Sequence, residues 1–175
     1  MLNEAGVTFG TACPVLDEDA LKQKFFEPAE IASQLAIAKA RSVDGDWVIG
    51  SDSVVSVDGR TFNKPVDRDD AAEHLRFFSG KDMALTSAVA LARKGVLDWS
   101  HVETAMLKVR PLSDAFIADY LDAEWPEVGY TVGVFRLEAR GVQLFDSIKG
   151  DYFAILGMPL LPLLSALRAR GLLPA

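Results

Sequence analysis

WVIGSDSVVSVDGRTFNKP, residues 47–65, is the stretch of sequence that decides the fold. Residues 47–49 form a short apolar run, which is typical of a buried strand. Small polar residues at 50–53 interrupt this run, and residues 54–57 then resume a strand pattern. Asp58-Gly59 is a strong signal for a hairpin turn, after which a second strand follows. The stretch therefore predicts a β-hairpin with a polar break in its first arm.

Asp52 lies in that break, at the end of the first apolar run. A buried carboxylate is costly unless it has a partner, and the small neighbours of Asp52 leave room for a ligand or a metal ion. Lys64 returns along the far arm of the hairpin toward the same region. One carboxylate and one ammonium group suit a Mg²⁺-phosphate ligand. The alternative, which composition alone favours, is a satisfied Asp in a tight bend and a surface Lys.

Composition and charge limit the classes of function. The chain has 175 residues, half of them hydrophobic, enough for one domain or two small lobes with a sizeable core. A net charge of −7 argues against a nucleic-acid-binding surface, which is usually basic, but permits a nucleotide site with a local positive patch. Cys13 is the one cysteine, so an intrachain disulfide and a zinc site of several cysteines are excluded.

Two observations argue against a membrane protein. No basic segment followed by an apolar run comes after Met1. The longest apolar stretch, residues 153–167, contains Gly157, Pro159 and Pro162 and is too broken to cross a membrane. We expect a cytoplasmic protein that binds neither membranes nor nucleic acid.

Periodicity and turn signals predict the other elements. The expected helices are residues 28–42, 67–78 with Asp67 as N-cap, 113–124 with Ser113 as N-cap, and a last one that opens at Pro159 and Pro162 and stops at Gly171. The expected strands are residues 82–93 and 96–109, which form a hairpin through Lys94-Gly95, and residues 143–148. Residues 2–9 are interpreted as the end of a helix and the start of a strand, and residues 14–19 as an acidic loop.

Two further charged residues are candidates for a site. Glu18, in the acidic loop, has the chemistry to bind a metal, although such runs more often form a solvated face. Lys39 lies near the end of the helix over 28–42, where a cation either stabilises the helix dipole or points into a phosphate site. His74 and His101 are far apart and show no paired spacing, and neither a Walker loop nor a G-x-S-x-G or H-E-x-x-H motif is present.

Five segments in order resemble the Maf family of nucleoside triphosphate pyrophosphatases. The residues that carry the resemblance are LAIAKA (35–40), VIGSDSVV (48–55), NKP (63–65), FFSGKDMALTSAVAL (77–91) and IKGDYFAILGMPLLPLL (148–164). Each motif alone is weak, but their order and spacing cover nearly the whole chain. The resemblance implies a single domain over residues 1–175, with an elongated mixed β-sheet flanked by helices and a cleft between two lobes. It further implies a homodimer and the hydrolysis of nucleoside triphosphates, with modified or pyrimidine nucleotides among the candidates, to the monophosphate and pyrophosphate.

The resemblance also assigns roles to residues. It implies that Asp52 and Lys64 are catalytic, and that Lys39, Lys81 and Glu138 bind substrate. Glu18 and Asp52 would bind a divalent cation, Mg²⁺ or Mn²⁺.

Two segments depart from the family pattern. The family opens with a strand and an S-x-S-P-R-R loop, and this N-terminal strand is missing from the expected elements of this chain. The family also has D-K-A-G-x-Y-x-I-Q-G where residues 130–141 read YTVGVFRLEARG, so that Glu138 replaces a glutamine. The alternative function is therefore a weakened or inactive homologue that binds nucleotides without hydrolysing them.

Overall fold

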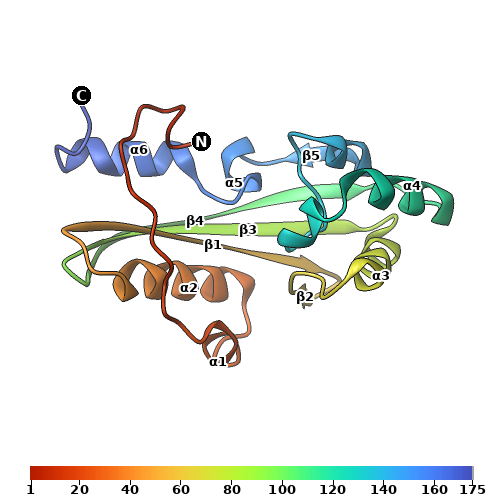
Figure 1. Ribbon diagram of the computed structural model, residues 1–175, viewed down its shortest axis with the longest axis horizontal. Coiled ribbons are helices and arrows are strands. Elements are labelled where there is room, and N and C mark those ends of the chain that lie inside the picture. The colour runs from red at the N-terminus through yellow and green to blue at the C-terminus, as the bar shows by residue number, and fades with distance from the viewer. Residues whose placement is uncertain (175) are drawn as a thin grey trace. The chain divides into compact units, whose positions relative to one another are not determined.

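The computed structural model describes residues 1–174 (Figure 1). Its helices are α1 (Glu18–Lys22), α2 (Pro28–Ser42), α3 (Arg68–Phe78), α4 (Asp114–Glu124), α5 (Tyr152–Ile155) and α6 (Leu160–Ala169), with 3-10 turns at Glu127–Tyr130 and Arg140–Leu144. Its strands are β1 (Trp47–Val57), β2 (Arg60–Phe62), β3 (Asp82–Arg93), β4 (Val96–Val109) and β5 (Phe145–Lys149). The chain is therefore an α/β protein.

The described strands form one sheet in the order β2-β1-β3-β4-β5. Two-residue turns at Asp58-Gly59 and Lys94-Gly95 join β1 to β2 and β3 to β4, and all four turn residues have positive φ. This is the turn geometry that matches the twist of a hairpin. The described strands form an antiparallel sheet rather than the mixed sheet that the resemblance implies. A two-residue turn joins only antiparallel neighbours, which accounts for the pairing of β1 with β2.

The prediction of a break in the first arm of the hairpin is wrong. β1 runs without interruption from Trp47 to Val57, so Asp52 lies inside a strand rather than in a bend. Tertiary contacts, described below for residues 50–53, hold these weak strand formers in the extended conformation. The other two long strands have the predicted bounds, and β5 begins two residues later than expected.

The predicted helices over 28–42, 67–78 and 113–124 are confirmed. Asp67 and Ser113 cap α3 and α4 by accepting hydrogen bonds from the backbone N–H groups of Asp70 and Phe116. The interpretation of the N-terminus is wrong: residues 2–6 form turns, no strand follows, and the acidic stretch contributes the first residues of α1. Asp17 caps this short helix, which explains why a run of acids begins a helix instead of a loop.

The chain divides into two compact units. Unit 1 comprises residues 1–53, 86–104 and 151–175, and unit 2 comprises residues 54–85 and 105–150. Unit 1 has an apolar core in which α6 packs on β3 through Leu163, Leu167, Val89 and Leu91. The expectations of a single domain and of a cleft between two lobes stay predictions.

Unit 2 has an aromatic core. Phe62 of β2 packs edge-on against Phe78 and His74 of α3, with ring centroids 4.7 and 5.1 Å apart. Burial lowers the pKa of His74, against the raising effect of Asp70, so the imidazole is a neutral packing group. His74 is thus a packing residue on the face of α3, as its position on a helix leads one to expect.

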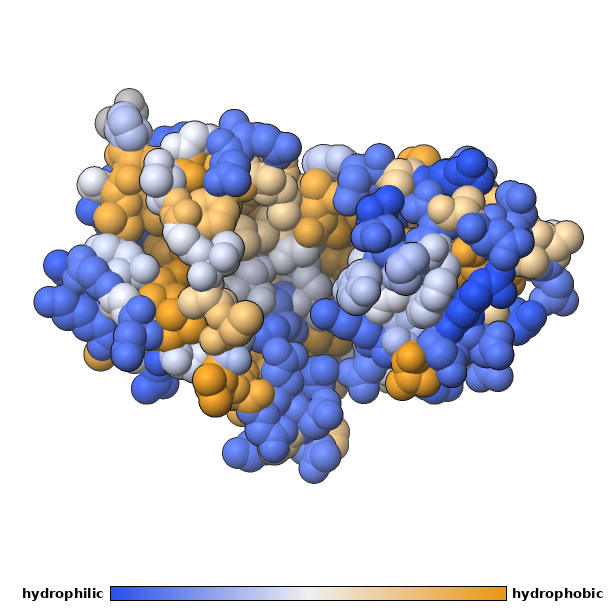
Figure 2. Space-filling view, viewed as in Figure 1, coloured by the Kyte–Doolittle hydropathy of each residue, from blue (hydrophilic) through white to orange (hydrophobic). Residues whose placement is uncertain are grey.

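Two observations on the helices bear on function. Among the described residues, no helix is long and apolar enough to cross a membrane. Figure 2 shows α1, at the bottom of the view, covered mainly by hydrophilic residues, and this helix has no buried side chain.

Candidate functional site

One lysine joins two carboxylates in unit 1. The Nζ atom of Lys39, on α2, lies 2.6 Å from Oδ1 of Asp52, on β1, and 2.9 Å from Oε1 of Glu18, the first residue of α1. The Asp52 side chain is 12% exposed and the Lys39 side chain 20%, whereas Glu18 is 39% exposed. The structure thus brings together three of the residues that the sequence singled out.

Gly50 explains how the helix and the strand come this close. A Cβ atom at Gly50 would lie 2.5 Å from the backbone nitrogen of Ala40 and still closer to the carbonyl oxygen of Ala36. Residues 36, 39 and 40 lie on one face of α2, and residues 50 and 52 lie on one face of β1. The missing side chain at Gly50 therefore lets α2 rest on the strand, with Lys39 above Asp52.

Replacing Gly50 by Ala is expected to destabilise the protein and to lower its activity together. The methyl group would push α2 away from β1, which costs about 2 kcal/mol or more and lengthens the bond between Lys39 and Asp52. We expect thermal unfolding at least about 5 °C lower. Gly10→Ala is the matched control, because a Cβ there meets nothing within 4 Å. Equal unfolding temperatures for the two variants would contradict this account.

Burial and charge act in opposite directions on Asp52. Burial raises the pKa of Asp52, and the negative charge of Glu18 adds to this, while Lys39 and Lys22 lower it; the net direction is upward. Burial alone would lower the pKa of Lys39, but its bonds to Asp52 and Glu18 prevail and raise it. Lys39 therefore stays charged, and Asp52 is a stronger base than an ordinary aspartate.

The serines beside Asp52 have structural roles. Side chains alternate along a strand, so Ser51 and Ser53 point away from the face that carries Asp52. Ser51 Oγ donates toward the carbonyl oxygens of Gly157, at 2.7 Å, and Ala88, at 2.9 Å, and Ser53 Oγ lies 2.7 Å from Ser87 Oγ. These serines hold β1 to β3 and to the segment after α5, and the expectation that small neighbours leave room beside Asp52 stays a prediction.

The donor set of this centre fits a divalent cation that is also held by a ligand. Glu18 and Asp52 are hard oxygen donors that already converge on one cation, the Lys39 ammonium. No group of three or more potential ligands occurs among residues 1–174. Mg²⁺ is commonly bound by one or two carboxylates plus substrate phosphates, so two carboxylates suffice for such a site.

The other predicted site residues belong to unit 2. Lys64 is exposed just after β2, and Glu138 is exposed in the turn before residue 140. Lys81 Nζ lies 3.0 Å from Oδ2 of Asp58 and 3.5 Å from the ring centroid of Phe77. Their roles at the substrate stay predictions.

The sequence analysis did not identify one charged residue of unit 1 that acts on Asp52. Lys22, at the end of α1, acts on Asp52 and lowers its pKa. The signal was its spacing of four residues from Glu18, which places both on one side of a helix, but the helix itself was not predicted.

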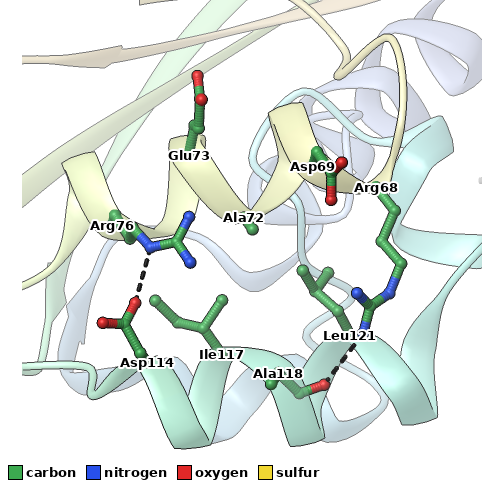
Figure 3. Close-up of a pocket in the computed structure, with 9 residues that line it drawn as sticks. All are labelled: Arg68, Asp69, Ala72, Glu73, Arg76, Asp114, Ile117, Ala118 and Leu121. Carbon is green, nitrogen blue, oxygen red and sulfur yellow. Dashed lines mark hydrogen bonds and ion pairs between the residues drawn. The ribbon is translucent and has the colours of Figure 1, made fainter.

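Unit 2 also has a cavity of about 350 Å³ between α3 and α4 (Figure 3). Both arginines of its rim have partners: Arg76 Nε lies 2.7 Å from Oδ1 of Asp114, and Arg68 is bonded to Asp122 and to the carbonyl oxygen of Ala118. These pairs stabilise the packing of the two helices, and none of the predicted site residues lines the cavity.

The fold is that of an α/β protein in which one lysine bridges two carboxylates, an arrangement compatible with an anionic, metal-bound ligand. Comparison with known proteins identifies the family: the Maf-like protein family matches residues 1–170 of this chain. The chain belongs to the Maf family, as its motifs suggested.

The chain is similar over its whole length to curated relatives. It is 44% identical to a 7-methyl-GTP pyrophosphatase of Rhizobium meliloti (strain 1021), over 100% of this chain and 92% of the relative. It is 44% identical to a nucleoside triphosphate pyrophosphatase of Sphingopyxis alaskensis, over 99% and 92%, and 45% identical to one of Nitrobacter hamburgensis, over 99% and 89%.

Proposed function

We propose that the protein is a nucleoside triphosphate pyrophosphatase, which hydrolyses its substrate to the nucleoside monophosphate and pyrophosphate with Mg²⁺ or Mn²⁺. Family membership and the printed activities of the relatives support this. The observation that carries the proposal is the Lys39 bridge between Asp52 and Glu18. It supplies a base and a fixed positive charge, which are the two requirements of hydrolysis at phosphorus.

In the proposed reaction, a water molecule attacks the α-phosphorus and the bond from this atom to the α–β bridging oxygen breaks. Pyrophosphate leaves with that oxygen and the electron pair of the broken bond. Asp52 accepts the proton of the attacking water as a general base. Lys39 holds Asp52 in place and stabilises negative charge near it.

Glu18 and Asp52 would hold the divalent cation, which, when bound, would supply charge neutralisation to the phosphates. Lys64 is proposed to contact phosphate oxygens, since its ammonium group is exposed. Lys81 would do the same by exchanging its ion pair with Asp58 for one with substrate. Glu138 is proposed to contact substrate away from the phosphates, because two anions repel.

The second candidate function is nucleotide binding without hydrolysis. The departure at residues 130–141 favours it, because Glu138 stands where the family has a glutamine. The two functions differ in one result: only the enzyme releases pyrophosphate.

The test is a panel of 7-methyl-GTP, GTP, ATP, CTP, UTP and dTTP, each with Mg²⁺, Mn²⁺ or EDTA. We expect metal-dependent release of pyrophosphate and the monophosphate from at least one nucleotide. Release of orthophosphate and a diphosphate would contradict cleavage of the α–β bond. Binding without release would favour the second function.

The resemblance also supports a single-domain, cytoplasmic homodimer, and we propose this assembly. Light scattering on the purified chain tests it, with a mass of about twice 19.0 kDa expected.

A further inference from the structure

Lys39 lies between the two side chains that would hold a divalent cation. Its Nζ atom is 2.9 Å from Oε1 of Glu18 and 2.6 Å from Oδ1 of Asp52, so one positive charge bridges two carboxylates. One or two carboxylates are also the usual protein ligands of Mg²⁺ that is shared with phosphates. The ammonium group of Lys39 and a divalent cation therefore need the same two side chains.

The competition between these two cations is direct. Each carboxylate has a second oxygen, but a metal ion bound there would still lie close to the ammonium group and be repelled by it. The ammonium group donates hydrogen bonds and accepts none, so Lys39 cannot become a metal ligand itself. No group of three or more potential metal ligands occurs among residues 1–174, so the described part of the chain offers no alternative set of ligands around this pair.

The structure allows Lys39 to leave the carboxylates without unfolding α2. Its charge is carried on a flexible four-carbon stem, while the backbone of α2 rests on β1 at Gly50. Glu18 belongs to α1, which packs beside α2 (Figure 1), and its side chain is 39% exposed. A cation from solvent can therefore reach the carboxylates from the side of Glu18 while α2 stays in place.

From these contacts we propose that Lys39 is an internal competitor of the divalent cation. Without a ligand, Lys39 neutralises part of the charge of Glu18 and Asp52 and so weakens their affinity for free metal ions. When a metal ion binds, the ammonium group moves away from the carboxylates and becomes available to phosphate oxygens. This inference rests on the proposed function, because it concerns the cation and the phosphates of that same site.

The test measures Mn²⁺ binding by calorimetry, without nucleotide, in the parent and in the variants Lys39→Met and Lys39→Gln. Both variants remove the positive charge, and glutamine keeps a hydrogen-bond donor should methionine prevent folding. We expect the Kd for Mn²⁺ to be about tenfold lower in both variants, which corresponds to about 1.4 kcal/mol. Lys24→Met is the matched control, because it removes the same charge at an exposed position of unit 1; its Kd should stay within about twofold of the parent value.

The unfolding temperature gives a second readout that needs no turnover. A ligand that binds only the folded state stabilises it more as its affinity rises. Increasing Mn²⁺ should therefore raise the unfolding temperature of the two Lys39 variants more than that of the parent. Adding Asp52→Asn to Lys39→Gln should remove this gain, since one of the two carboxylates is then lost.

Three outcomes would overturn the inference: Mn²⁺ binding by folded Lys39→Gln that is no tighter than in the parent, an equal gain in Lys24→Met, or a gain that survives Asp52→Asn. The proposed function fails separately. It fails if the parent releases no pyrophosphate from any nucleotide, and in that case the Mn²⁺ measurements still decide the role of Lys39.

Discussion

Replacing Asp52 by Asn is expected to reduce pyrophosphate release about a thousandfold, the scale of losing a general base, without lowering the unfolding temperature. Asparagine keeps the shape of the side chain and an oxygen that can accept the hydrogen bond of Lys39 Nζ. It accepts no proton from water. A loss of activity in a protein of unchanged stability would identify Asp52 as part of the chemistry.

The expected stability of the Asp52→Asn variant follows from the direction in which folding shifts the pKa of Asp52. Since the pKa of Asp52 is raised by folding, the native state binds this proton more tightly than the unfolded chain does. Stability therefore falls as pH rises from the ordinary range of aspartate through the raised pKa. The asparagine of the variant does not ionise, so the variant keeps that stability at neutral pH. For the parent, kcat/KM should fall at low pH, because protonated Asp52 cannot accept a proton from water.

Asp44→Asn is the control for charge, because Asp44 is exposed in unit 1. It removes the same negative charge without touching the centre. If Asp44→Asn lost as much activity as Asp52→Asn, or if the latter kept most of its activity, Asp52 would not be the base.

Replacing Lys39 by Met is expected to lower both activity, about a hundredfold, and stability, by about 2 kcal/mol. The methionine leaves two carboxylates facing each other without their shared cation. The activity loss reflects the missing positive charge. The destabilisation is smaller than for a fully buried pair because Glu18 is half exposed.

Two comparisons separate this electrostatic cause from lost packing. The destabilisation should shrink as pH falls, because protonated Asp52 no longer needs a cation. It should also shrink in the double variant with Asp52→Asn, as expected for residues in direct contact. Lys24→Met, at an exposed position of unit 1, is the control. Destabilisation that was equal at all pH values and additive in the double variant would show that only packing was lost.

Elements with a strong local pattern were predictable from the sequence. Pro28 and the apolar spacing after it fix α2, and Lys94-Gly95 between alternating residues fixes the β3–β4 hairpin, both with the predicted bounds. The polar residues of β1 were misjudged because residues 50–53 are weak strand formers individually. What keeps them extended is non-local: the contact of Gly50 with α2, and the serine bonds to the segment after α5.

The candidate site was predictable as a set of residues but not as an arrangement. Asp52, Lys39 and Glu18 were candidates on the sequence alone, with a satisfied Asp, a helix-end lysine and a solvated acid as the alternatives, and the resemblance gave each of them a role. The bond of Lys39 to both carboxylates depends on where α1 returns to α2, which no local pattern encodes.

Glu18 is held less rigidly than Lys39 and Asp52, because it lies on the short helix α1. Asp52 and Lys39 are held by a long strand and a fifteen-residue helix, whereas α1 has five residues, none of them buried. Segments with so few apolar contacts open locally at a small free-energy cost, far below that of global unfolding. Each opening of α1 would withdraw Glu18 from Asp52 and Lys39, and with it Lys22, which acts on Asp52 with the opposite sign. The electrostatic field around Asp52 is thus coupled to a local unfolding equilibrium, and any ligand that Glu18 helps to hold would shift that equilibrium toward the closed helix.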